Sequence, residues 1–189
     1  MCSLPASHDC VNGRYVRMPS TEDEIRSCMH EYELAGFVGC IGSADATHIV
    51  MDMCAENLKV LNTGGKSSHP TRAFNITVNH RRRILYTTVG YPGKWNDKTL
   101  VTFDEFLRGI HDGKLYSHIE YDLEELRGDD VHIRRYRGVW VMVDNGYLNW
   151  SATVPPIKAP ADYNELRWSK WLESLRKDVE CTFGILKGR

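Results

Sequence analysis

Apolar and polar positions alternate along the chain in a way that predicts several strands. Over residues 39–50, apolar and β-compatible residues flank Asp45, and small residues surround the acid itself. This pattern predicts a buried strand that carries one carboxylate. Residues 73–79 and 84–89 are two further β-rich runs, and the short basic link between them favours an antiparallel hairpin.

A fourth strand is predicted over residues 138–144, where five consecutive apolar residues are followed by Asp144. The dipeptide Asn145-Gly146 then predicts a turn. Residues 150–154 are compatible with one more strand, which ends at two prolines.

Three segments have helical spacing. Thr21 and Glu24 are spaced as a capping box, so a helix is expected to begin there and to end at Gly36. Residues 102–111 predict a short amphipathic helix, and residues 162–186 predict a long one. The expected buried stripe of the long helix comprises Leu172, Leu175, Val179, Phe183 and Leu186.

The remaining segments have weaker patterns. Residues 57–72 are expected to be a polar loop, residues 91–97 a turn, and residues 114–137 show no decisive period. The loop contains Gly64-Gly65-Lys66-Ser67, but a phosphate-binding loop needs a glycine where Val60 stands, so a nucleotide site is excluded there. Strands interrupted by helices and closed by a helix predict an α/β fold with a mixed sheet.

Composition narrows the class of protein. The chain has 189 residues, enough for one domain, and its 42% hydrophobic and 26% charged residues are typical of a soluble globular protein. A net charge of −1 gives no global attraction to nucleic acid, so a DNA-binding surface would need local basic clusters. The six cysteines lack any C-x-x-C pair and are expected to be reduced thiols. No apolar run reaches the length of about 20 residues that a membrane helix needs, and no signal peptide is expected.

Four carboxylates are the candidates for chemistry: Asp45 in the first strand, Asp97 in the turn, Asp144 after the fourth strand and Glu180 on the last helix. Acids on neighbouring strands lie close enough to share a cation, and they cannot all remain ionised without a proton or a metal. Oxygen ligands favour Mg²⁺ or Mn²⁺, and two such ions can promote hydrolysis of a phosphodiester.

Each acid also has a structural interpretation. Asp45 can accept backbone N–H bonds, and Asp97 can cap the helix that follows it. Asp144 can hold its own turn, and Glu180 can pair with Arg176 or Lys177. His48 is expected to be a packed strand histidine rather than a metal ligand, and Trp168 and Trp171 are expected in the core.

Four ordered motifs resemble one family. The segments GFVGCIGSADATHI (36–49), TTVGYPGKWNDKTL (87–100), GVWVMVDNGY (138–147) and RKDVECTFGILKGR (176–189) are similar to the PIF/Harbinger transposases, in particular to the plant transposon protein branch of their DDE nuclease domain. The resemblance covers residues 31–189, so residues 1–30 are expected to be a polar lead-in with a helix start. It implies a ribonuclease H-like fold, of the retroviral-integrase type, with a centre of two Mg²⁺ or Mn²⁺ ions that cleaves DNA.

The resemblance also assigns roles to the acids. The first-strand acid corresponds to Asp45 and the helix acid to Glu180. The middle acid is expected to be Asp144, 36 residues before Glu180, with Asp97 as a fourth ligand or an orienting group. Cys181 stands where the family typically has Arg, the chain ends at Arg189, and no helix-turn-helix is recognised before residue 20, so a truncated or relic transposase is also expected.

Basic clusters provide candidate phosphate contacts, with a solvated surface as the alternative for each of them. These residues are Arg81, Arg82, Arg83, Arg134, Arg135, Lys170, Arg176 and Lys177. The predicted function is a metal-dependent DNA endonuclease or transposase located in the nucleus, and the partners considered are DNA, a separate DNA-binding protein and a second copy of the chain. The alternatives are a catalytically inactive, domesticated binding protein and, on the same fold, a metal-dependent ribonuclease.

Overall fold

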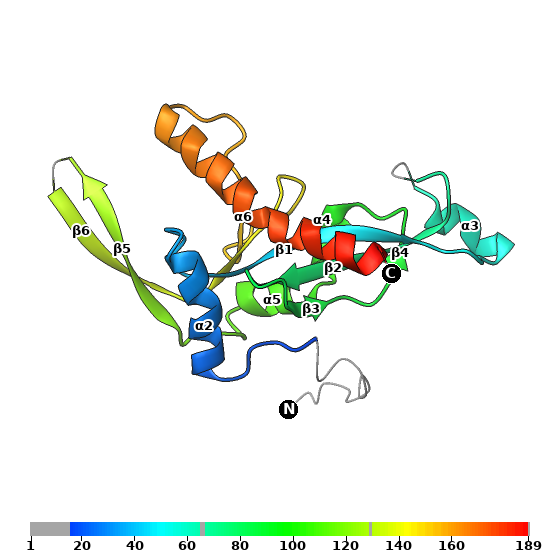
Figure 1. Ribbon diagram of the computed structural model, residues 1–189, viewed down its shortest axis with the longest axis horizontal. Helices are drawn as coiled ribbons and strands as arrows, with labels where there is room; N and C mark the ends of the chain where they lie inside the picture. Colours follow the sequence, from blue (N-terminus) through cyan, green and yellow to red (C-terminus); the bar gives the residue numbers. More distant parts are fainter. Residues whose placement is uncertain (1–15, 65–66, 129, 189) are drawn as a thin grey trace.

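The computed structural model describes residues 16–64, 67–128 and 130–188 (Figure 1). The predicted lead-in up to residue 15, two of the six cysteines and the dipeptide at 65–66 lie outside the described residues. The elements in chain order are α2 (Glu22–Glu33), β1 (Cys40–Val50), α3 (Glu56–Asn62), β2 (Thr71–Val78), β3 (Ile84–Thr87), β4 (Tyr91–Pro92), α4 (Asp97–Thr102), α5 (Glu105–His111), β5 (Glu120–Arg127), β6 (Asp130–Arg137), β7 (Trp140–Met142), β8 (Thr153–Val154) and α6 (Tyr163–Lys187).

A mixed sheet forms the centre of the fold. Its strand order is β3-β2-β1-β7-β8, and β4 adds a short pairing to β2. The first three strands are antiparallel, as the hairpin pattern predicted, whereas β7 and β8 run parallel to β1. Helices flank the sheet. This architecture confirms the predicted α/β class and is compatible with a ribonuclease H-like fold.

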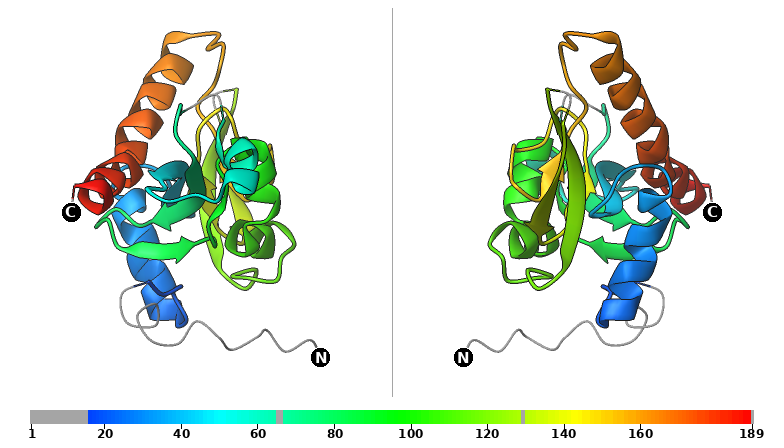
Figure 2. Two further views of the ribbon diagram at one scale, coloured as in Figure 1. Left: turned by 90° about the vertical axis from the view of Figure 1, so that its right-hand side faces the viewer. Right: turned by 90° about the vertical axis from the view of Figure 1, so that its left-hand side faces the viewer.

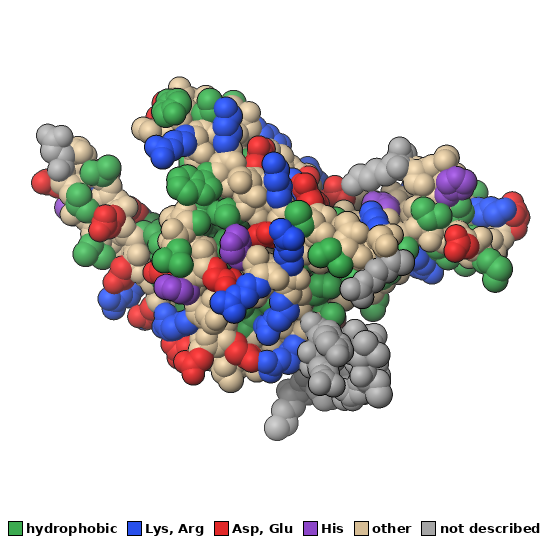
Figure 3. All heavy atoms as spheres, viewed as in Figure 1, with side chains coloured by type: hydrophobic (Ala, Val, Ile, Leu, Met, Phe, Trp, Pro, Cys, Tyr) green, Lys and Arg blue, Asp and Glu red, His purple; other side chains and the backbone are tan. Residues whose placement is uncertain are grey.

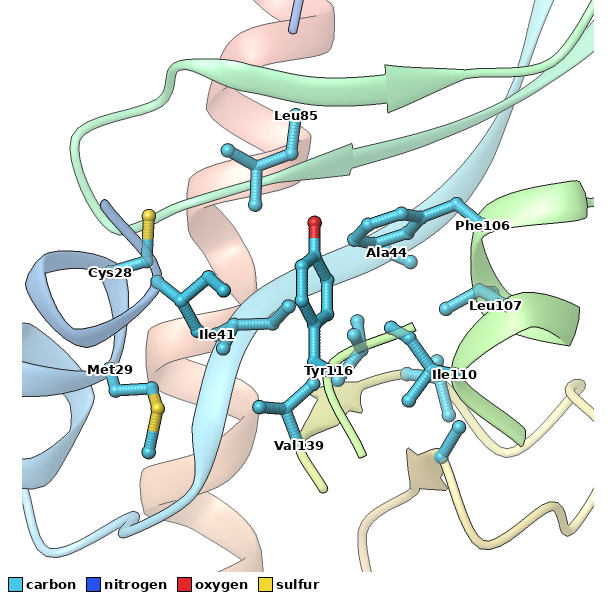
Figure 4. Packing of buried hydrophobic residues seen from close by; sticks show 14 of the residues in the cluster. Cys28, Met29, Ile41, Ala44, Leu85, Phe106, Leu107, Ile110, Tyr116 and Val139 are labelled. Atoms are coloured by element: carbon cyan, nitrogen blue, oxygen red, sulfur yellow. The ribbon is translucent and has the colours of Figure 1, made fainter. Parts of the chain in front are cut away.

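The two faces of the sheet are covered by different helices. Figure 2 shows α6 on one side of the sheet and α5 on the other. On the α5 side, Phe106, Leu107 and Ile110 pack with Ile41 and other residues of the largest core cluster (Figure 4). On the α6 side, Leu172 packs against Cys40 and Met142. The first part of β1 and strand β7 therefore lie between two apolar clusters.

The first helix begins as its capping pattern predicts. Thr21 Oγ1 accepts a hydrogen bond from the Glu24 backbone N–H at 3.3 Å. The Glu24 carboxylate accepts from the Ser20 N–H at 2.9 Å, one residue earlier than in a standard capping box. The side chains of Ile25, Cys28, Met29 and Tyr32 are buried, as their spacing indicates.

Residues 57–72 were expected to be a polar loop, and this prediction is wrong for the first half, which forms helix α3. The helix has two turns, and Leu58, Val60 and Leu61 on it are all exposed. A helix without a buried apolar face has no amphipathic period, so the pattern in the sequence could not reveal it.

Residues 114–137, which lack a clear pattern, contain the two-stranded ribbon β5–β6. The ribbon extends away from the sheet (Figure 1). Ion pairs cross it at Glu120–Arg137 (2.8 Å) and Asp122–Arg135 (2.9 Å). Because most of its side chains on both faces are in contact with solvent, the strands do not show apolar alternation.

Helix α6 confirms the predicted long helix, but two details of the prediction are wrong. Leu186, expected in the buried stripe, is 44% exposed, and Trp171, expected in the core, is 46% exposed. The helix is longer than the sheet face that it covers, so both ends pass beyond the core (Figure 1). None of the described helices combines the length and apolarity that a bilayer crossing requires.

Candidate active site

The sheet brings Asp45 and Asp144 to the same level. Ser43 of β1 is in register with Met142 of the parallel strand β7, and each acid follows two residues later. Side chains two residues apart share a face, so both acids lie on the side of Met142, which packs against α6. Neighbouring strands are about 4.8 Å apart, which places the two carboxylates within electrostatic reach of each other.

Asp97 approaches the same turn from helix α4. Asn96 caps this helix by accepting from the Thr99 N–H at 2.8 Å, so Asp97 occupies the first helical position instead of the cap. A Cβ atom added to Gly146 would lie 2.9 Å from Asp144 Oδ1 and 3.4 Å from Asp97 Oδ2. Both carboxylates therefore border a small space that only glycine leaves open.

Asp144 also has the structural role that its turn predicted. Its Oδ1 accepts a hydrogen bond from the Gly146 N–H at 2.6 Å. This bond holds the carboxylate over the turn and leaves Oδ2 for another partner.

Glu180 reaches the site through Arg176. The Nη1 atom of Arg176 donates to Asp45 Oδ2 at 2.9 Å, and its Nη2 atom donates to Glu180 Oε1 at 2.9 Å. The side chains of Arg176 and Asp45 are only 16% and 20% exposed, whereas that of Glu180 is 48% exposed. The alternative pairing of Glu180 with Arg176 is thus confirmed, and the guanidinium lies between two predicted metal ligands.

The electrostatic state of Asp45 reflects this arrangement. Burial raises the pKa of its carboxyl, while hydrogen bonds from the Ala46 N–H and the charge of Arg176 lower it. The nearby charge of Asp144 raises it again. An ionised Asp45 therefore depends on a neighbouring positive charge, which Arg176 provides in this structure.

The donor set is chemically suited to a divalent ion. All four candidates offer carboxylate oxygens, which Mg²⁺ and Mn²⁺ prefer, and the space at Gly146 lies between two of them. Within residues 16–64, 67–128 and 130–188, however, no three His, Cys, Asp or Glu side chains are arranged to hold an ion. The four acids are thus of the right chemical type for a divalent ion. In this structure, however, the guanidinium of Arg176 contacts two of them, Asp45 and Glu180.

His48, the other residue considered near the acids, contacts a neighbouring strand. Its Nδ1 lies 3.2 Å from Thr71 Oγ1 of β2. This contact agrees with a packed strand histidine.

Most of the predicted DNA-contacting arginines have acidic partners. Arg81 pairs with Glu31, and Arg82 lies 3.6 Å from Asp178. Arg134 and Arg135 pair with acids of β5 across the ribbon. Their charges are therefore partly neutralised within the molecule.

Helix α6 offers basic side chains of a different kind. Lys170 and Lys177 are exposed, and neither forms an ion pair with any residue that the structure describes. Figure 3 shows Lys and Arg side chains gathered along this helix. This is the surface best suited to phosphate contacts near Glu180.

Three buried polar residues near the acids were not recognised from the sequence. They are Asn75, Asp104 and Tyr147, which are joined by hydrogen bonds. Asp104 precedes an apolar helical run, and an Asp at this position is a signal for an N-cap. The hydrogen bonds of the three residues join segments that are distant in the chain, so the sequence does not reveal them.

Comparison with known proteins agrees with the motifs. The family model described as plant transposon protein matches residues 13–189. Protein ALP1-like from Arabidopsis thaliana is 27% identical over 179 residues, which is 93% of this chain and 41% of that protein. The chain thus spans about two fifths of the length of this curated relative. No solved structure matches significantly. The resemblance seen in the four motifs is confirmed, and the chain belongs to the plant transposon protein family.

Proposed function

We propose that this chain is a metal-dependent DNA endonuclease of the transposase type. One observation carries the proposal: the sheet register and the glycine turn bring Asp45, Asp97 and Asp144 together where β7 ends beside the middle of β1, and Arg176 links Asp45 to Glu180. Acids gathered beneath a basic helix suit a reaction on a phosphodiester.

The residues have distinct tasks in this proposal. Asp45, Asp144 and Glu180 would hold Mg²⁺ or Mn²⁺, with Asp97 as a fourth ligand or as the group that orients Asp144. The metal, when bound, would supply activation of water and stabilisation of the leaving oxygen. Arg176 would give up its carboxylate partners, and its guanidinium could then contact a phosphate together with Lys177.

The partners follow from the same chemistry. DNA would be held through its phosphates by Lys170 and Lys177, which gives affinity but no sequence preference. Selection of a DNA site would then need a separate DNA-binding protein or further parts of a longer chain, and the proposed place of action is the nucleus. Transfer of the freed 3′-hydroxyl to a second DNA is a possible next step of the same site.

A second function is favoured by a different observation. Arg176 already pairs with both Asp45 and Glu180, so these two acids have a cationic partner without a metal. A binding protein derived from a transposase, without catalytic activity, would keep such an arrangement for stability alone.

Nicking of supercoiled plasmid distinguishes the two. The 189-residue chain is incubated with plasmid and Mg²⁺ or Mn²⁺, beside the variants Asp45→Asn, Asp144→Asn and Glu180→Gln. We expect the parent to convert plasmid to the open-circular form, and each variant to lose at least about 100-fold in rate, because each removes a negatively charged ligand.

The matched control is Glu173→Gln, which removes an exposed carboxylate seven residues before Glu180 on the same helix. This variant should retain parental nicking. A folded parent that neither nicks DNA nor gains thermal stability from Mn²⁺ would reject the nuclease and favour the binding protein.

A further inference from the structure

A buried chain of hydrogen bonds lies behind the candidate acids. The Tyr147 hydroxyl donates to Asn75 Oδ1 at 2.5 Å, and Asn75 Nδ2 donates to Asp104 Oδ2 at 2.6 Å. The other Asp104 oxygen accepts from the Leu107 N–H at 2.8 Å. Asn75 and Asp104 are fully buried, and Tyr147 is 4% exposed.

Asn75, the middle residue of the hydrogen-bonded chain, lies next to the part of β1 that carries Asp45. Asn75 lies in β2 opposite Ala46 of β1, the residue directly after Asp45. Its own backbone is held on the other side, where its N–H donates to Thr88 Oγ1 at 2.9 Å. The position of the Asn75 amide is therefore tied to the strand that carries Asp45.

Tyr147, at one end of the hydrogen-bonded chain, lies in the turn that carries Asp144. Tyr147 ends the turn that begins at Asp144, and its N–H donates to the Asp144 carbonyl at 3.3 Å. The hydroxyl bond to Asn75 anchors this turn to β2. Loss of that bond would free the far end of the segment that holds the Asp144 carboxylate over Gly146.

Asp104, at the other end of the hydrogen-bonded chain, lies close in sequence to the helix that carries Asp97. Asp104 caps α5 and lies two residues after the end of the short helix α4, which begins at Asp97. Its bond to Asn75 thus attaches the junction of α4 and α5 to the sheet. The position of Asp97 depends on that junction.

Burying this hydrogen-bonded network costs free energy, which a purely structural role does not explain. Asp104 has no ion-pair partner among the described residues, and burial raises the pKa of its carboxyl to about 6. Apolar residues of similar volume would fill the same space without burying a charge. A fully connected polar network, in contrast, fixes one arrangement of the segments that it joins.

We propose that Asp104, Asn75 and Tyr147 are positioning residues that fix the relative places of the segments bearing Asp45, Asp97 and Asp144, the acids that would share a divalent ion. The inference rests on the proposed metal-dependent function and adds residues that touch neither metal nor DNA. Each of the three joins a different acid-bearing segment, so removing one bond loosens the relative placement of the acids while the cores on both faces of the sheet remain.

The test compares two buried tyrosine hydroxyls. Tyr147→Phe removes the bond to Asn75, and Tyr116→Phe removes a bond to the Pro19 carbonyl of 2.8 Å in the same core but on the side of α2. Binding of Mn²⁺ to each purified protein is followed by the electron paramagnetic resonance signal of the free ion, and melting temperatures are measured without metal.

Both variants should melt a few degrees below the parent, because each loses one buried hydrogen bond. We expect Tyr147→Phe to bind Mn²⁺ about 10-fold more weakly, as is usual for groups that orient metal ligands, and Tyr116→Phe to change the affinity less than about 2-fold.

An exchange of partners provides a second readout. In Asn75→Asp, two carboxyl groups face each other, and the amide that donates to Asp104 is lost. The double variant Asn75→Asp with Asp104→Asn restores an acceptor on residue 75 and a donor on residue 104. It should recover Mn²⁺ affinity to within about 3-fold of the parent, whereas Asn75→Asp alone should lose about 10-fold.

The outcomes separate the inference from the function on which it rests. A parent that binds no Mn²⁺ overturns the metal centre and this inference with it. A parent that binds Mn²⁺, with equal affinities for Tyr147→Phe and Tyr116→Phe, overturns the positioning role alone. Failure of the exchange variant to recover binding while it remains folded has the same meaning.

Discussion

At the scale of single residues, Arg176 is the cation in contact with the candidate acids. Its guanidinium contacts Asp45 and Glu180, one acid from β1 and one from its own helix. A divalent ion bound by the same acids would compete with this guanidinium. In the proposed mechanism, binding of a metal would have to break this ion pair.

Arg176→Gln tests this competition. Without divalent ions the variant should be less stable than the parent by about 1–2 kcal/mol, because the mostly buried Asp45 loses its positive partner. Its melting temperature should rise more on addition of Mn²⁺ than that of the parent, since no guanidinium then has to be displaced.

The control is Lys177→Gln, which removes the adjacent exposed charge on α6. Its response to Mn²⁺ should match that of the parent. An equal rise in melting temperature for Arg176→Gln and the parent would show that guanidinium and metal do not share the acids.

Residue types alone could identify part of this site. Asp45, Asp144 and Glu180 stand out because an acid within or directly after an apolar segment needs a partner. The role of Arg176 could not be predicted in full, because its contact with Asp45 spans 131 positions of the chain. Its proximity to Glu180, one helical turn away, was readable.

At the scale of elements, helix α6 both packs against the sheet and carries the candidate acid Glu180. Val179 packs against Ile76 and Val78 of β2, and this contact holds the turn of the helix that bears Glu180. Leu186, further along the same predicted stripe, passes beyond the sheet. The helical period therefore predicts the direction of a side chain but not the extent of the surface that covers it.

Truncating the two side chains should separate these cases. Val179→Ala should lower the free energy of unfolding by about 1–3 kcal/mol, because it leaves a cavity beneath a fully buried position. Leu186→Ala should change it by less than about 0.5 kcal/mol. Urea unfolding of both variants measures the difference, and equal losses would mean that the end of α6 is also covered by protein.

The ribbon β5–β6, unlike helix α6, has no hydrophobic period that could reveal its strands. Its stability comes from cross-strand pairs such as Asp122–Arg135 and from the stacked rings of Tyr121 and Tyr136. Neither feature produces a period that marks a strand. Helix α3 was missed for the same reason, since no core face organises its sequence.

At the scale of the whole molecule, one buried carboxyl should influence how stability varies with pH. The pKa of Asp104 is raised from 3.8 to about 6 by burial. The folded state therefore holds this proton more tightly than the unfolded chain does, and the contribution of Asp104 to the free energy of unfolding falls as the pH rises from about 4 to about 6.

Comparison with Asp104→Asn isolates this effect. The stability of the parent relative to the variant should decrease by about 2 kcal/mol between pH 4 and pH 7, as measured by urea unfolding at several pH values. Asp112→Asn is a control of opposite sign, because a hydrogen bond from Lys114 lowers the pKa of that exposed carboxyl. A constant difference between the parent and Asp104→Asn would show that Asp104 has an ordinary pKa.

The class of fold, the central strands, the hairpin of β2 and β3, the long last helix and the family could all be predicted from the sequence. These features rest on local periodicity and on ordered motifs, both of which are readable along the chain. The candidate acids were recognisable for the same reason, because each stands out against its immediate neighbours.

Only the tertiary structure decided how these parts meet. The parallel register of β1 and β7 places Asp45 level with Asp144, and the glycine turn brings Asp97 beside them. The pairing of Arg176 and the buried bonds of Asn75, Asp104 and Tyr147 join segments that are distant in the chain. Such contacts depend on strand order and packing, which set distances that no local pattern contains.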